Sequence, residues 1–357
     1  MTPTTHNTAD FAPNKAQNIE VNSKKKAKAW HYLPQLPLQV SGYFRRPFSF
    51  VAAIKWLFSS WFPLSERLII LAISLLSWAF FHPALEVCTE LAPGWIAQIY
   101  VRNLVLMLVI AGGLHLYFYS YKKQGDALHY DARSQAQKHK KFTFNLQVKD
   151  NMFWSIVSGV TVWSMYEVLM MYAMANGHVP MLMLPEDYVL LALLIFLVPI
   201  WETLYFFVIH RFLHWPPLYK SVHYLHHRNT NVAPWAGMSM HPIEHVLFLG
   251  SVMVHFFVAA NPLLIIFHLQ YYTLSAITTH TGFQGFNVGG RMIMALGTFH
   301  HQLHHRFFEC NYGGLEVPID QWAGSFHDGT DESHAAFLQR HKAKSLKAKK
   351  NRQQSAS

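Results

Sequence analysis

Long hydrophobic runs separated by short polar segments dominate the chain. Apolar residues run through about 97–121, 152–175 and 187–209. A membrane-spanning helix needs about 20 predominantly apolar residues, so each of these runs predicts a span. A shorter run at about 68–82 reaches that length only together with 51–62. The pattern therefore predicts about four spans.

A fifth apolar region, about 246–279, carries Asn261-Pro262 near its middle. Proline removes a helical hydrogen bond, and the residue before it is disfavoured in the helical conformation. The region therefore predicts a hairpin of two short helices. Together these elements predict an all-α fold, an integral membrane helical bundle.

Basic residues alternate between successive loops, which gives the spans an orientation. The loops at 83–96 and 176–186 contain no Lys or Arg, whereas the loop at 122–149 contains seven. Lys and Arg are enriched in cytoplasmic loops of membrane proteins. We therefore expect both termini and the region after the fourth span on the cytoplasmic side. Arg102 does not fit this scheme, and we expect it to extend toward the outer membrane surface.

Composition supports the membrane class and excludes others. Hydrophobic residues make up 52% of the 357 residues and charged residues 13%, compared with about 25% charged residues in soluble domains. The formal charge of +10 comes largely from the chain ends and shows no basic stripe, so we expect no nucleic-acid partner. Two distant cysteines, Cys88 and Cys310, form no disulfide framework.

These patterns divide the chain into four parts. We expect a disordered basic arm at 1–45, in which 1–30 has no signal-peptide core, and membrane helices with a basic cytoplasmic loop at 46–150. A histidine-rich part is expected at 151–335, followed by a basic disordered tail at 336–357.

Histidine is unusually abundant in the part at 151–335. The chain has 24 histidines, and 14 of them lie between His210 and His305. The clusters are His210-Arg-Phe-Leu-His214, His223-Tyr-Leu-His226-His227, His241-Pro-Ile-Glu244-His245 and His300-His301-Gln-Leu-His304-His305, with His280 alone in Thr-His-Thr-Gly. Such clusters beside membrane spans predict a metal site, whereas isolated histidines usually pack in the core.

The spacing indicates two metal ions. Helical residues four apart lie on one face, so His210 and His214 can reach one point. In H-x-x-H-H the third histidine widens the arc enough to serve a neighbouring ion. Two such motifs and one H-x-x-x-H supply eight imidazoles, which are too many for one ion. Imidazole suits iron, zinc, copper and nickel. The scarcity of nearby carboxylates disfavours the soluble di-iron bundle.

These motifs resemble the fatty acid hydroxylase/sterol desaturase superfamily over about residues 190–330. HRFLH, HYLHH, HPIEH, HTG and HHQLHH appear in the family's order, followed by Asn311-Tyr312-Gly313. The stretch from Asp320 to Phe326 is similar to the family's closing element, with altered order. The first 150 residues show no such resemblance.

The resemblance implies a membrane anchor with a cytosolic cap that holds two iron ions, and O2-dependent hydroxylation or desaturation of a lipid. Carried over residue by residue, the implied metal ligands are His210, His214, His223, His226, His227, His301, His304 and His305. His280 matches the family's H-[ST]-G histidine, and His241 matches its HP-x-[DE] element as a further candidate. His245 and His300 are alternatives for completing the set.

Acidic residues near the clusters are candidates to orient the ligand rings by accepting their second N–H. Glu244 lies inside the third cluster, and Glu202 lies about two helical turns before His210. No haem, Rossmann or flavin motif is present. We therefore expect a separate electron-transfer protein, similar to cytochrome b5, ferredoxin or a reductase.

Two other functions compete with lipid oxidation. A membrane zinc or iron transporter would place its ligands along the spans. A zinc-dependent lipid hydrolase or isomerase would need fewer ligands and a carboxylate base. We expect a multi-pass protein, in a bacterial inner membrane rather than in the endoplasmic reticulum.

Overall fold

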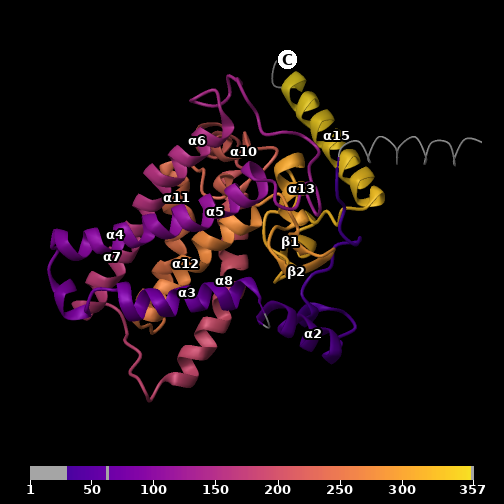
Figure 1. The fold of residues 1–357 in the computed structure, drawn as a ribbon. Helices are drawn as coiled ribbons and strands as arrows, with labels where there is room; N and C mark the ends of the chain where they lie inside the picture. Colours follow the sequence, from indigo (N-terminus) through magenta and orange to yellow (C-terminus); the bar gives the residue numbers. More distant parts are fainter. Residues whose placement is uncertain (1–29, 62–63, 355–357) are drawn as a thin grey trace, which may run out of the picture.

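The computed structural model describes residues 30–61 and 64–354. This part of the chain is a helical bundle, and its one small sheet pairs β1 (Gly285–Val288) with β2 (Arg291–Ala295) in antiparallel register. The bundle helices α3, α4 and α7 run roughly alongside one another, and α13, β1 and β2 gather near one end of the molecule (Figure 1). The predicted all-α class is confirmed.

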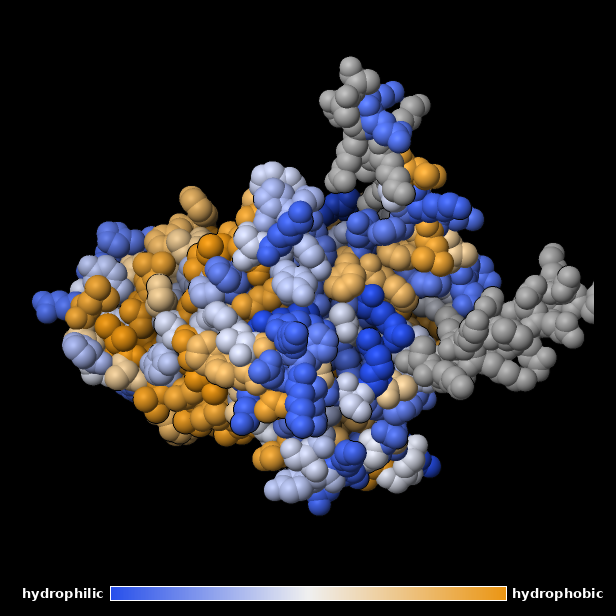
Figure 2. All heavy atoms as spheres, turned by 90° about the horizontal axis from the view of Figure 1, so that it is seen from above, coloured by the Kyte–Doolittle hydropathy of each residue, from blue (hydrophilic) through white to orange (hydrophobic). Residues whose placement is uncertain are grey.

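Three continuous helical segments are long and apolar enough to cross a membrane: Pro93–Ser120, Gln147–Ala175 and Tyr188–Leu213. The first contains α4 (Pro93–Met107) and α5 (Gly113–His115), the second α6 (Gln147–Trp154) and α7 (Thr161–Ala175), and the third is α8. The pair α2 (Phe50–Trp61) and α3 (Glu66–Phe81) passes as a fourth span bent by 43°. Hydrophobic side chains gather over the end formed by α4 and α7 (Figure 2).

The predicted hairpin is present and its second arm is central. Helix α11 (Pro242–Leu249) continues as a 3-10 helix to Phe256, and α12 spans Pro262–Thr279. The Asn261 side chain accepts a hydrogen bond from the Leu264 N–H at 2.9 Å and so caps α12. Because α12 packs against α3, α7 and α8, it forms the buried core that fixes the position of His280 at its end.

The expected outward extension of Arg102 is wrong. Its side chain is buried and forms an ion pair with Glu167 of α7, while Asn103 also hydrogen-bonds both residues. A buried charge inside an apolar bundle requires a partner. The sequence showed Arg102 on one span without showing that Glu167, 65 residues later, lies opposite it.

Replacing Glu167 with Leu should destabilise the bundle by about 3–5 kcal/mol, because the Arg102 guanidinium would stay buried without its partner. Thermal unfolding of the purified protein in detergent measures this effect. The matched control is the double variant Arg102→Met/Glu167→Leu, which removes both charges and should recover most of the loss. Equal stability of the single and double variants would contradict a charge effect.

Both chain ends differ from the expected disordered segments where they are described. Trp30 is buried against Phe299, with ring centroids 5.0 Å apart, and Arg306 lies over its ring at 4.3 Å. Residues 1–29 of the predicted arm lie outside the described residues. The predicted tail is helical, since α15 spans Asp331–Gln354. Its Ala, Lys, Gln and Arg residues have high helix propensity, so this segment forms a helix despite its many basic residues.

Candidate metal centre

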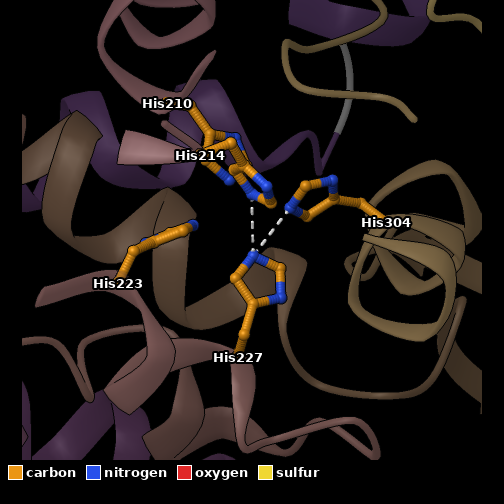
Figure 3. A group of neighbouring side chains, drawn as sticks. All are labelled: His210, His214, His223, His227 and His304. Atoms are coloured by element: carbon orange, nitrogen blue, oxygen red, sulfur yellow. Dashed lines mark hydrogen bonds between the residues drawn. The ribbon is translucent and has the colours of Figure 1, made fainter. Parts of the chain in front are cut away.

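Nine histidines converge in two neighbouring groups. The first group contains His210, His214, His223, His227 and His304, and their rings point toward a common centre (Figure 3). The second group contains His226, His280, His301 and His305. Within each group the candidate ligand nitrogens all lie within 4.8 Å of one another. The two groups together contain the eight predicted ligands and His280.

Helical spacing explains this division. His210 and His214 lie one turn apart at the end of α8, and His223 and His227 lie one turn apart across a π-helical turn and α10 (Tyr224–His227). His301 and His305 lie one turn apart on α13 (Phe299–Phe307). The middle histidine of each H-x-x-H-H motif, His226 or His304, joins the other group. Each motif therefore contributes to both groups.

The nitrogen spacing fits metal coordination. In the first group, His227 Nε2 lies 3.1 Å from His214 Nε2 and 3.0 Å from His304 Nε2. In the second group, the Nε2 atoms of His280, His301 and His305 form a triangle with sides of 3.0, 3.0 and 3.1 Å. Two nitrogens at right angles, each about 2.1 Å from one ion, would be about 3.0 Å apart.

Hydrogen bonds at the opposite ring nitrogen fix five of these imidazoles. The Nδ1 atoms of His210, His304, His280 and His226 lie 2.7, 2.6, 2.7 and 3.3 Å from the carbonyl oxygens of Tyr312, Cys310, Ala276 and Ser239. His223 Nδ1 lies 2.7 Å from Glu244 Oε1. Carbonyl oxygens only accept, so a neutral ring must donate from Nδ1, and its Nε2 lone pair then faces the centre.

Burial keeps these rings neutral. The pKa of His226 falls to about 4, because burial disfavours the charged ring. The pKa values of His227, His301 and His305 fall well below the usual histidine value through burial and the repulsion between neighbouring imidazoles. Neutral imidazole is the form that binds metal. The donor set therefore fits two metal ions held by nitrogen ligands.

The structure places the other histidine candidates outside both groups. His241 caps α11 by accepting the Ile243 N–H at 3.2 Å, away from the nine rings. His245 bonds Ser158 Oγ at 2.8 Å through Nδ1, and His300 lies 4.0 Å from Asp320 Oδ2. The HP-x-[DE] match at His241 thus marks a helix start, and the residue of that cluster that contacts a ligand ring is Glu244.

The two acidic candidates have different surroundings. Glu244 is buried and accepts from His223, as expected for a residue that orients a ligand ring. Glu202 lines a cavity beside His210, and among the described residues it has no hydrogen bond to a histidine. Glu202 and His210 line the same cavity, and a role for Glu202 in orienting a ligand ring stays a prediction.

A loop after α13 holds two ligand rings from behind. Asn311 has φ 57°, a conformation that Asn tolerates better than most residues. Asp320 accepts the N–H groups of Tyr312 and Gly313 at 2.9 and 2.7 Å, which fixes the loop that presents the carbonyls of Cys310 and Tyr312. Sequence reasoning could not find these main-chain acceptors; the Asn311-Tyr312-Gly313 motif was their only signal.

Replacing Asp320 with Ala should weaken metal binding by roughly 10–100-fold, the usual cost of losing an outer support of metal ligands. The loop would lose two hydrogen bonds, and the carbonyls facing His210 and His304 would shift. Metal titration of the purified apo-protein measures this effect. Asp328→Ala, on a nearby loop, is the matched control. Wild-type affinity in Asp320→Ala would show that the loop does not position the rings.

The structure also explains why the H-T-G motif ends in a glycine, Gly282. Gly282 has φ 77°, and a Cβ atom there would lie 2.4 Å from Tyr119 Oη. That hydroxyl donates toward the carbonyls of Thr281 and Val232 at 2.8 and 3.1 Å. The glycine therefore lets a membrane helix anchor the segment that carries His280.

A cavity of about 260 Å³ adjoins the centre. Its histidine lining includes His210, His223, His226, His280 and His301. Other lining residues come from α2, α3, α8, α12 and the loop after α13. It therefore lies where the membrane helices meet the histidine-bearing part. A lipid held there would contact both groups of rings.

Residues 194–325 match the family model described as fatty acid hydroxylase. This match and the curated relatives support the resemblance of this part of the chain to the fatty acid hydroxylase/sterol desaturase superfamily. The matched range contains all nine converging histidines. The resemblance found from the motifs is thereby confirmed, and the domain ends beside the Asp320 loop.

Curated relatives give the same family. The Delta(7)-sterol 5(6)-desaturase of Eremothecium gossypii is 30% identical over 137 residues, which cover 38% of each protein. That of Saccharomyces cerevisiae is 30% identical over 125 residues, covering 35% of this chain and 33% of the relative. Human lathosterol oxidase is 34% identical over 125 residues, covering 34% and 41%.

The chain thus spans less than half the length of the curated relatives it matches. No solved structure matches the chain. These relatives come from fungi and human, so the expected preference for a bacterial inner membrane over the endoplasmic reticulum has no support. The structure supports a membrane protein, since three helices have the length and composition of membrane spans.

Proposed function

We propose that the protein is a membrane-bound di-iron oxygenase that uses O2 to hydroxylate or desaturate a lipid. His210, His214, His223, His227 and His304 would hold one iron, and His226, His280, His301 and His305 the other. The observation that carries this proposal is the pair of adjacent, neutral, all-histidine groups beside a cavity at the membrane helices.

Iron bound there would supply the capacity to reduce O2 and to oxidise an unactivated C–H bond. The protein's own residues hold the ligand rings in place and shape the cavity in which the substrate lies. Glu244 and the carbonyls of Cys310 and Tyr312 hold rings in place. Phe206 and Phe248 line the cavity beside the histidines and exclude water from the reacting carbon. The sterol enzymes among the relatives are consistent with a lipid substrate.

Two electrons must be supplied for each O2 consumed, and we propose that a separate electron-transfer protein supplies them. Its docking face would be the basic loop at 122–149, which carries Lys122, Lys123 and Lys141 among its seven basic residues. An acidic carrier would be attracted there. The same basic residues support a cytoplasmic position for this loop and for the metal centre.

Metal analysis combined with an oxygen assay tests this function. The purified full-length protein should contain about two irons per chain. It should consume oxygen when given a reductant and a membrane lipid extract, and one lipid should gain an oxygen atom or lose two hydrogens by mass spectrometry. Heat-inactivated protein is the control.

The same experiment separates the competing functions. Bound zinc with a hydrolysed or isomerised lipid would favour the zinc enzyme and overturn the oxygenase. Metal uptake into proteoliposomes without oxygen consumption would favour a transporter. The grouping of nine histidines at one end of the spans supports the oxygenase, because transporter ligands line a path through the membrane.

A further inference from the structure

Besides Glu244, which bonds His223, four charged side chains line the cavity beside the histidines: Glu66, Arg67, Glu202 and Glu316. We call the three carboxyl groups the acidic wall. Glu66 and Arg67 begin α3, Glu202 lies on α8, and Glu316 follows the Asn311-Tyr312-Gly313 loop. Charged groups that lie among apolar membrane helices carry a large desolvation cost and usually mark a functional site. The metal centre does not use these four residues.

Arg67 is already neutralised. Its Nη2 donates to Glu316 Oε2 at 2.6 Å and its Nη1 to Glu316 Oε1 at 3.4 Å. Trp56 Nε1 donates to the same carboxylate at 3.1 Å. Among the described residues that line the cavity, Arg67 is the only Lys or Arg. No free cation is therefore present there to bind a lipid carboxylate or phosphate.

The other two carboxyl groups are not matched by a cation. Glu66 accepts a hydrogen bond from Thr278 Oγ1, and neither Glu66 nor Glu202 forms a salt bridge among the described residues. Both side chains line the cavity and keep acceptor oxygens available. An anionic lipid end would find no free cation among these lining residues, whereas a hydroxyl group can donate to a carboxyl oxygen.

We propose that the acidic wall binds the polar end of the lipid substrate, and that this end is a hydroxyl group rather than a carboxylate or phosphate. The inference rests on the proposed function, because it assumes that the lipid in this cavity is the one oxidised. Glu202 and Glu66 accept from the hydroxyl, and Glu316 keeps Arg67 from attracting anions.

The size of the cavity and the distance from Glu202 to the histidines restrict which carbon of the lipid can react. Glu202 precedes His210 by eight residues, which is about 12 Å along α8. The cavity volume of about 260 Å³ is small beside the roughly 300–1,000 Å³ of typical ligand pockets. The hydroxyl and the reacting carbon therefore belong to one compact part of the lipid, and the remainder of the molecule extends out of the cavity.

Competition binding with lipids that differ only at the polar end tests the proposal. The metal-loaded full-length protein is used without reductant, so that no turnover occurs. Tritiated cholesterol and tritiated 1-octadecanol are the probes. Their competitors are cholesterol methyl ether and cholesterol sulfate, and 1-methoxyoctadecane and octadecanoic acid. At least one alcohol should bind about tenfold more tightly than its ether and its anion, because neither can donate the hydrogen bond to a buried carboxyl oxygen.

Two variants connect this preference to the acidic wall. Glu202→Leu should weaken binding of the alcohol about tenfold without affecting the ether. Glu316→Gln should free Arg67 and shift the preference toward the anion. Glu186→Gln, on an exposed loop, is the control and should behave as wild type. Metal content and gel-filtration profile show whether each variant is folded.

Three results would overturn the inference: neither alcohol binds, an anion binds wild type as well as its alcohol does, or Glu316→Gln leaves the preference unchanged. These results are independent of those that test the oxygenase itself. Iron content and oxygen consumption can fail while the alcohol preference holds, and the reverse can also occur.

Discussion

Replacing His301 with Ala should reduce bound iron from two ions to one per chain and abolish lipid oxidation. His301 Nε2 lies 3.0 Å from His280 Nε2 and 3.1 Å from His305 Nε2, so its loss opens the four-membered group at its centre. The five-membered group should keep its ion, because it shares no ligand with the other. Elemental analysis and lipid mass spectrometry of the purified variant measure both effects.

The reciprocal variant and two controls make the result specific. His227→Ala should also leave one iron, because His227 occupies the same central position between His214 and His304. His241→Ala should retain both irons, since His241 caps α11 instead. His178→Ala, on an exposed loop, should be neutral. Two irons and full oxidation in His301→Ala would refute the assignment of the second group.

Replacing Glu244 with Ala should weaken metal binding in the five-membered group by roughly 10–100-fold. His223 would lose the carboxylate that holds its Nδ1–H at 2.7 Å, and the buried ring could turn or change tautomer. Titration of the apo-protein with Fe(II), followed by metal analysis, measures the loss. The second group should be affected less, because no ring in it bonds Glu244.

Glu244→Gln separates orientation from charge. The Gln carbonyl oxygen can still accept the Nδ1–H of His223, so this variant should bind metal more tightly than Glu244→Ala. Glu186→Ala serves as the exposed control. If Gln is as damaging as Ala, then the negative charge of Glu244 matters more than its hydrogen bond.

Sequence patterns predicted the parts of this protein that depend on local periodicity. The apolar runs gave the spans, Asn261-Pro262 gave the hairpin, and the H-x-x-H-H spacing gave two groups of ligands. These features follow from the geometry of one helix. His280 required the family resemblance, because a single histidine has no spacing to interpret.

Features that depend on two distant segments were not predictable from one sequence. The buried pair of Arg102 and Glu167 joins two spans, and Trp30 packs on the helix that carries His301. The carbonyl groups behind His210 and His304 belong to the main chain and leave no side-chain signature. Likewise, only the folded chain brings Glu66, Glu202 and Glu316 to one cavity.

The main-chain carbonyls behind four of the ligand rings also determine which mutations can disturb the orientation of these rings. No amino-acid substitution removes the main-chain carbonyl oxygen of residue Tyr312, Cys310, Ala276 or Ser239, because every amino acid carries one. Genetic damage to ring orientation is therefore concentrated at a few side chains, Glu244 and the loop-fixing Asp320 among them. Natural variants of Tyr312 or Ala276 should be judged by backbone conformation, not by side-chain chemistry.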